Sequence, residues 1–320
     1  LQKADLQFAL FNQIHGSRMT LTAAILLITS ALAHAGWNLF SKKDHPSTAS
    51  FLLANLFGTL LVMPLLILGR VQVIDIIRQL WPLLLLTGFF QGLYFWGLAY
   101  AYKRGELSVA YPLARSMPAL MVTLLVFLFG QGETIGTAVL FGIVLIIAGG
   151  FLIPLTSFRD FSLQRYKSVA VAAALLAAAG TAGYSLTDDF ALEFIRGNRP
   201  VTLRQNFLIA FYYIGLQQVT TIFWQGLVVI PRWNERRLFM QQLANPLSSI
   251  IKGAGILVTY ALVLISMGYV TNVSYVVAFR QLSIPIGLIF GILFLQERSC
   301  GPKITAVVLL FAGVVLVGLG

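Results

Sequence analysis

Two arginines stand inside long apolar stretches, where a charged side chain is costly. Arg115 lies in Y-A-Y-K-R-G-E-L-S-V-A-Y-P-L-A-R-S-M-P, residues 100–118, and Arg280 lies in S-Y-V-V-A-F-R, residues 274–280. A helix after the polar turn at 103–106 would place Arg115 roughly 13 Å further on, near the middle of a bilayer core about 30 Å thick. Such an arginine either faces a cavity or a ligand, or it is paired structurally or snorkels to the interface. The first alternative predicts a binding site.

The guanidinium group selects one class of ligand. It is a planar fork of donors that suits a phosphate, phosphonate or carboxylate group. Tyr111 precedes Arg115 by four residues, about one helical turn, so the two share a face, whereas Tyr275 and Arg280 are five residues apart. We expect four tyrosines to line a cavity with the arginines: Tyr94, Tyr111, Tyr184 and Tyr275.

Other polar residues also occur at helical spacing. His34 and Asn38 are four residues apart on one face, with Trp37 adjacent, which suits either a substrate cavity or a hydrogen bond between helices. Asp188 follows Tyr184 by four residues and is either a site for a proton or another coupling ion, or the solvated end of a helix. The spacing of three glutamines fits one stripe along a helix: Gln217, Gln218 and Gln225. Lys252 lies near a predicted helix end, and we expect its side chain to snorkel to the membrane interface.

The composition defines the class of protein. Hydrophobic residues make up 58% of the chain and charged residues 10%, whereas a soluble domain has about a quarter charged residues. The chain is therefore predicted to be an integral membrane protein. Its net charge of +11 gathers in short loops beside apolar stretches, which suits anionic lipid headgroups and argues against a nucleic-acid partner. Cys300 is the single cysteine and the three histidines form no metal-binding motif, so we expect neither a metal nor a cofactor.

Ten apolar stretches are long enough to cross a bilayer, which takes about 20 residues in a helix. They are residues 20–40, 50–69, 81–102, 107–130, 135–155, 168–187, 205–230, 246–268, 273–295 and 304–320. We therefore predict an all-α membrane protein with ten transmembrane helices. Residues 1–18 form a polar N-terminal segment, and the true start is either upstream or at Met19. The positive-inside rule does not settle which side the termini face.

The two halves of the chain repeat. Pro82 and Pro246, Tyr111 and Tyr275, and Glu133 and Glu297 are each 164 residues apart, while Arg115 and Arg280 fall one residue out of register. Five helices per half is an odd number, so the second half would enter the membrane from the opposite face. We predict two inverted five-helix repeats, at residues 19–155 and 168–320, with a site between them near the bilayer midplane.

These residues carry a resemblance to a known family. The segment 99–152, with Y-K-R-G-E-L-S-V-A-Y-P-L-A-R-S-M-P, G-Q-G-E-T and A-G-G, resembles an EamA-like repeat of the drug/metabolite transporter superfamily. A more diverged copy runs from Gly255 to the C-terminus through S-Y-V-V-A-F-R and L-Q-E-R. The resemblance implies ten helices, a central cavity and secondary transport of small metabolites. Pro285 stands later than the proline of the first copy, which puts the equivalence of the two arginines in question.

We therefore expect a secondary transporter that moves an anionic or zwitterionic metabolite by alternating access, by export rather than import. Arg115, Arg280, His34 and Asn38 would bind the substrate, and Asp188 would serve proton or ion coupling. No G-x-x-x-x-G-K-[ST] motif is present, so ATP is not the predicted energy source. The alternative is a flippase for a lipid-linked substrate; an enzyme would need a catalytic constellation that the sequence lacks. We expect a bacterial inner membrane location and a monomer or homodimer.

Overall fold

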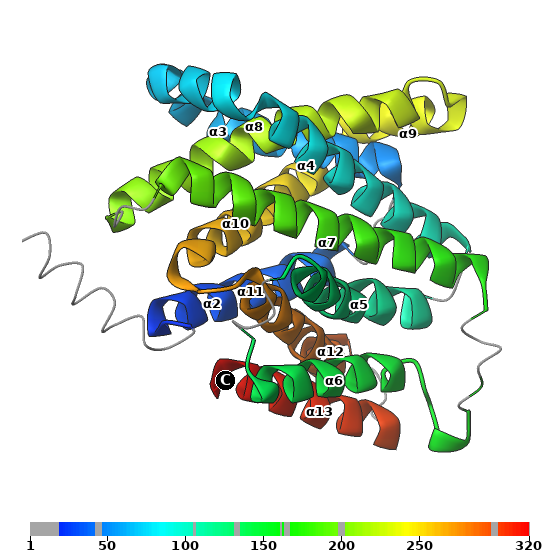
Figure 1. Ribbon diagram of the computed structural model, residues 1–320. Helices are drawn as coiled ribbons and strands as arrows, with labels where there is room; N and C mark the ends of the chain where they lie inside the picture. Colours follow the sequence, from blue (N-terminus) through cyan, green and yellow to red (C-terminus); the bar gives the residue numbers. More distant parts are fainter. Residues whose placement is uncertain are drawn as a thin grey trace, which may run out of the picture.

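The chain is a bundle of helices that cross one another at several angles (Figure 1). The computed structural model describes residues 19–41, 47–104, 107–130, 135–160, 162, 167–197, 202–295 and 300–319, and no strand occurs in these ranges. Seven of the helices described are long and apolar enough to cross a membrane, and three more are apolar but shorter. The prediction of an all-α, multi-pass membrane protein is thus confirmed.

The first half of the chain forms α2 to α6. Their bounds are Leu21–Ser41 for α2, Thr48–Leu68 for α3, Arg70–Arg104 for α4, Leu107–Leu128 for α5 and Thr137–Leu152 for α6. Ser47 caps α3, because its side chain accepts a hydrogen bond from the Ser50 backbone N–H. α4 begins earlier than the predicted stretch 81–102: its first turns are amphipathic, with Val73, Ile76 and Leu80 buried between charged residues.

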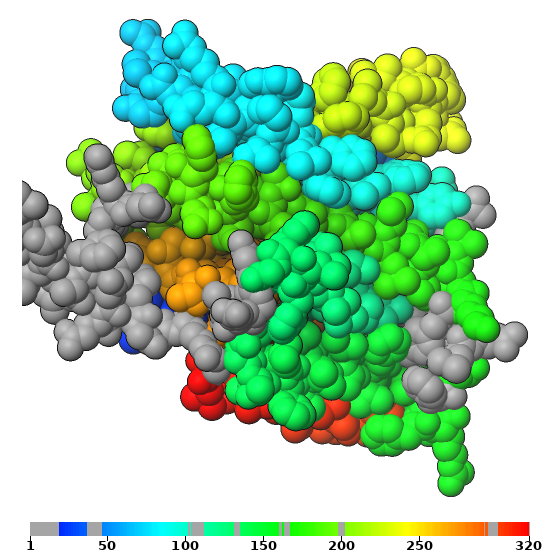
Figure 2. Space-filling model, viewed as in Figure 1, coloured from blue at the N-terminus to red at the C-terminus, as the bar shows by residue number. Residues whose placement is uncertain are grey.

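The second half forms α7 to α13. Their bounds are Val169–Arg196 for α7, Leu203–Val229 for α8, Trp233–Ala244 for α9, Leu247–Ser266 for α10, Val273–Phe279 for α11, Ser283–Leu295 for α12 and Gly301–Leu319 for α13. α7 continues past the predicted end at 187, because Ala191 and Leu192 are still buried. α9 was not predicted; it has no buried residue and stands at the edge of the molecule (yellow in Figure 2).

The predicted stretch 273–295 is broken in the middle. α11 and α12 are joined by a 3-10 turn, η5, at Arg280–Leu282. Pro285 follows the turn and has no backbone N–H, so it cannot donate the helical hydrogen bond to residue 281. A 3-10 segment within a membrane helix frees backbone carbonyls for other donors. Arg280 stands at this break.

The two halves pack together through small residues. α4 lies against α7, α10 lies against α2, and α6 lies against α13. A Cβ added at Gly180 of α7 would lie 2.7 Å from the Phe90 carbonyl oxygen of α4, and one at Gly142 of α6 would lie 2.5 Å from that of Gly313. Side chains larger than hydrogen cannot fit at these crossings, and close helix approach in membranes commonly depends on such residues.

Candidate functional site

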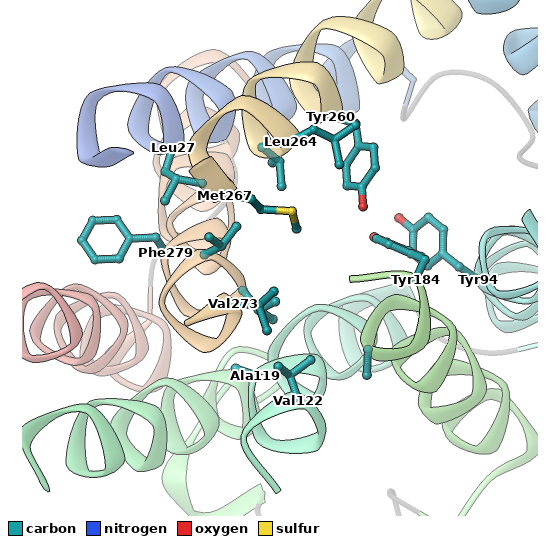
Figure 3. Packing of buried hydrophobic residues seen from close by; sticks show 14 of the residues in the cluster. Leu27, Tyr94, Ala119, Val122, Tyr184, Tyr260, Leu264, Met267, Val273 and Phe279 are labelled. Atoms are coloured by element: carbon teal, nitrogen blue, oxygen red, sulfur yellow. The ribbon is translucent and has the colours of Figure 1, made fainter. Parts of the chain in front are cut away.

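A cavity lies between helices of both halves, and the space of about 630 Å³ that it encloses is partly open to solvent. Its walls come from α2, α4, α5, α7, α8, α10 and η5. The polar residues that line it are Ser30, His34, Gln91, Tyr94, Arg115, Tyr184, Gln217, Gln218, Thr259, Tyr260 and Arg280. Three tyrosine hydroxyls, from Tyr94, Tyr184 and Tyr260, point toward one another from three different helices (Figure 3). The cavity is therefore polar, aromatic and basic.

Arg280 is held by aromatic side chains. Its guanidinium carbon lies 5.6 Å from the ring centroid of Tyr184 and 5.2 Å from that of Tyr260. Its Nη2 donates to the Tyr184 hydroxyl at 2.9 Å, and its Nη1 lies 3.4 Å from Ser185 Oγ. The two rings meet edge to face, with centroids 5.4 Å apart. Cation–π contacts orient a guanidinium without neutralising its charge.

Arg115 reaches the helix break from α5. Its Nη2 donates to the Arg280 carbonyl oxygen at 3.2 Å and to Ser283 Oγ at 2.6 Å. Only 5% of Arg115 is exposed, and its Nε has no hydrogen-bond partner among the described residues. Neither Arg115 nor Arg280 forms an ion pair with a carboxylate in the described part of the chain. Two positive charges thus adjoin the cavity without a described counter-ion.

Asp188 lies one layer behind the cavity wall. Its carboxylate accepts hydrogen bonds from Thr87 Oγ1 at 2.5 Å, Tyr213 Oη at 2.8 Å and Gln217 Nε2 at 2.8 and 2.9 Å, and also from the Tyr260 hydroxyl. All four donors are uncharged. Asp188 is fully buried, so the interpretation of a solvated helix end is wrong. Its hydrogen bonds tie α7 to α4, α8 and α10.

The structure places the predicted site residues as follows. His34, Tyr94, Arg115, Tyr184 and Arg280 all line the one cavity. Tyr275 is fully buried in α11 and is not part of the cavity lining. The side chains of Trp37, Asn38 and Tyr111 lie outside the described residues.

Sequence reasoning missed several residues of the site. Tyr260 contacts both Arg280 and Asp188, yet nothing in its local sequence distinguishes it from other tyrosines in apolar stretches. Gln217 belonged to the predicted glutamine stripe but was given no role. Lys252 does not snorkel: it is buried, and its Nζ donates to Ser50 Oγ of α3 at 3.1 Å. The burial of Lys252 follows from the packing of α10 against α3 and could not be predicted from the sequence.

No group of three or more His, Cys, Asp or Glu side chains that could hold a metal ion lies together among the described residues. The chemistry that the arrangement supports is the recognition of an anion by guanidinium, hydroxyl and amide donors.

Comparisons with known proteins agree with this fold. The model of the EamA-like transporter family matches residues 21–155, which run from the start of α2 to just past the end of α6. The resemblance found in the sequence is thus confirmed for residues 21–155, and the matched family suggests a membrane transporter of the drug/metabolite type. A solved crystal structure shares the fold, with a TM-score of 0.65 and 17% identity over 92% of this chain and 95% of the other. The comparison with curated proteins gives no match.

Proposed function

We propose that this chain is a ten-helix secondary transporter that moves a small anionic metabolite across the membrane by alternating access. The observation that carries the proposal is the pair of arginines beside the cavity without a described carboxylate partner. Buried charges are costly unless they are paired, so a site with uncompensated positive charge favours an anionic ligand. The guanidinium forks, in a cavity that Tyr184 and Gln217 also line, fit a phosphate, phosphonate or carboxylate group.

The pairing of helices supports an inverted repeat. In the proposed repeat, α2, α3, α4, α5 and α6 correspond to α7, α8, α10, α11–α12 and α13. Exchanging the halves then converts the contact of α4 with α7 into that of α10 with α2, and the contact of α4 with α8 into that of α10 with α3. The contacts of α3 with α8 and of α6 with α13 map onto themselves. Such a repeat gives two related conformations that open to opposite sides.

Asp188 is the proposed site of proton coupling. Tyr260 links it to the anion site, because the Tyr260 ring lies against the Arg280 guanidinium and its hydroxyl donates to Asp188. Binding of an anion at Arg280 would change the electrostatic environment of Tyr260. Protonation of Asp188 would in turn remove the negative charge to which the Tyr260 hydroxyl donates and so weaken that hydrogen bond. Substrate and proton would thereby affect one another's binding, as coupled transport requires.

The test is a thermal-shift screen of the purified protein with metabolites that carry phosphate, phosphonate or carboxylate groups, and with neutral analogues. A ligand at about 100 times its Kd should raise the stability of the folded state by about 2.7 kcal/mol. We expect an anionic metabolite to stabilise the wild type but neither Arg115→Gln nor Arg280→Gln. Arg115→Lys should retain part of the effect, because it keeps the charge but loses the fork.

The matched control is Arg78→Gln, which removes an exposed arginine of α4. It should respond to the anion like the wild type. Equal stabilisation of all the variants would show that Arg115 and Arg280 are structural. Stabilisation by lipid-linked compounds alone would favour a flippase.

A further inference from the structure

Four polar residues, three of them outside the cavity lining, face one another where α3 packs against α8. Asn55 Nδ2 donates to Gln225 Oε1 at 3.0 Å, and Thr59 Oγ1 lies 3.4 Å from Gln218 Oε1. All four side chains are buried. We call Asn55, Thr59, Gln218 and Gln225 the polar ladder.

The polar ladder runs from the cavity toward α9. Gln218 lines the cavity itself. Asn55 and Gln225 lie further toward the start of α3 and the end of α8, and α9 lies at that end: the Ala49 N–H donates to Glu235 Oε2 of α9 at 2.9 Å. Val229, the last residue of α8, forms a buried apolar cluster with Ala49 and Leu52 of α3, and Leu238 and Phe239 of α9 pack against this cluster. The polar ladder therefore extends from the cavity toward this apolar cluster at the α9 end of the bundle.

The opposite half of the same interface is apolar. There Val62 and Leu66 of α3 pack against Gly215 of α8, and a Cβ added at Gly215 would lie 2.9 Å from both methyl groups of Leu66. Apolar side chains in contact exclude water, whereas amides and hydroxyls can exchange their mutual hydrogen bonds for water. The part of the α3–α8 interface that holds the polar ladder thus differs from the apolar part at Gly215 in its ability to admit water.

The polar ladder is incompletely satisfied in the present conformation. Asn55 Oδ1, Gln218 Nε2 and Gln225 Nε2 are buried and have no hydrogen-bond partner among the described residues. Buried polar groups without partners are rare in folded proteins and usually have a functional or solvent-related cause. Water or a polar solute between α3 and α8 would supply the missing partners. These atoms can therefore form hydrogen bonds to water or to a polar solute that enters between α3 and α8.

We propose that the polar ladder is the closed form of a passage between the cavity and the α9 end, lined by α3 and α8. A polar solute leaves or enters the cavity there when the two helices separate. Lys252 of α10 lies near the same end, where its Nζ donates to Ser50 Oγ at the start of α3. This inference rests on the proposed transport function, because a passage has meaning only if the cavity exchanges solutes.

The test is the accessibility of introduced cysteines in membranes. The background is Cys300→Ser, which removes the single native cysteine. Asn55→Cys and Gln225→Cys place a thiol on each side of the polar ladder. Leu53→Cys is the buried control: it is 2% exposed, two residues from Asn55 and on the other side of α3. Leu227→Cys, at a position 53% exposed on the outside of α8, is the control that faces lipid. The probe is a charged, water-soluble methanethiosulfonate reagent.

We expect both cysteines of the polar ladder to react at least about tenfold faster than the two controls, since the reagent needs a hydrated thiolate. The proposal is wrong if either folded variant of the polar ladder reacts no faster than Leu53→Cys. Thr59→Cys changes the side-chain volume little and replaces any variant that does not fold. The labelling experiment needs no ligand, so its result is independent of the anion screen. Rapid labelling without anion binding would indicate a passage without an anion site, and anion binding without rapid labelling would indicate an anion site without this passage.

Discussion

At the scale of residues, one side chain joins the two chemical parts of the site. Tyr260 presents its ring to the Arg280 guanidinium and its hydroxyl to the Asp188 carboxylate. Arg115 in turn donates to the carbonyl oxygen of Arg280, so the two arginines act as one unit rather than as separate charges. The sequence placed Arg115, Arg280 and Tyr184 in a common cavity, because buried charge and helical spacing are local signals. It could not select Tyr260, whose role depends on how α10 packs against α7.

Asp188 should matter for stability as well as for coupling. Asp188→Leu removes the acceptor of four buried donors, and each donor left unsatisfied costs about 1–3 kcal/mol. Asp188→Asn keeps the shape and one acceptor oxygen, and the hydroxyl groups around it can rotate to accept from its amide. We predict a thermal midpoint well below that of the wild type for Asp188→Leu and a much smaller decrease for Asp188→Asn. Equal midpoints for the two variants would show that the hydrogen bonds to Asp188 contribute little.

At the scale of elements, the positions of the apolar stretches were predictable because about 20 apolar residues are a strong signal. The first turns of α4 were missed because Arg70, Asp75 and Arg78 lower the local hydropathy, although Val73 and Ile76 show helical spacing. α9 was missed because it is short and polar. The break at Arg280–Leu282 was not predicted either, although the late proline, Pro285, was noted as a departure from the first half.

Because α10 packs closely against α3, a small increase in side-chain size at their contact should lower the stability of the protein. A Cβ added at Gly253 would lie 2.3 Å from the Ala54 carbonyl oxygen, which belongs to rigid backbone. Gly253→Ala should therefore force the helices apart and cost about 1–3 kcal/mol. Gly226→Ala on α8 is the matched control, because its Cβ would meet only Ile230 Cδ1 at 3.7 Å. Thermal midpoints of the purified variants test this; a Gly253→Ala midpoint equal to that of Gly226→Ala would contradict the packing described.

At the scale of the whole molecule, helices from both halves of the chain enclose a basic cavity. Helix contacts that map onto one another when the halves are exchanged support the proposed inverted repeat. The site itself is asymmetric: Arg115 stands in a continuous helix, while Arg280 stands at a helix break. The internal repeat of the sequence predicts two related halves, but the one-residue shift between the arginines gives no indication that the Arg115 side chain contacts the Arg280 backbone. That contact depends on tertiary structure alone.

The central claim is that Arg115 and Arg280 bind the transported anion. The most direct measurement is exchange of a radiolabelled anionic metabolite, selected by thermal shift, across proteoliposomes that contain the same unlabelled compound. We predict exchange by the wild type and by Arg78→Gln. The exchange rate of Arg280→Gln should be lower by at least about a hundredfold, because the loss of a charge-assisted interaction of about 3 kcal/mol corresponds to that factor. Exchange by Arg280→Gln at the rate of the wild type, or equal exchange of a neutral analogue, would contradict it.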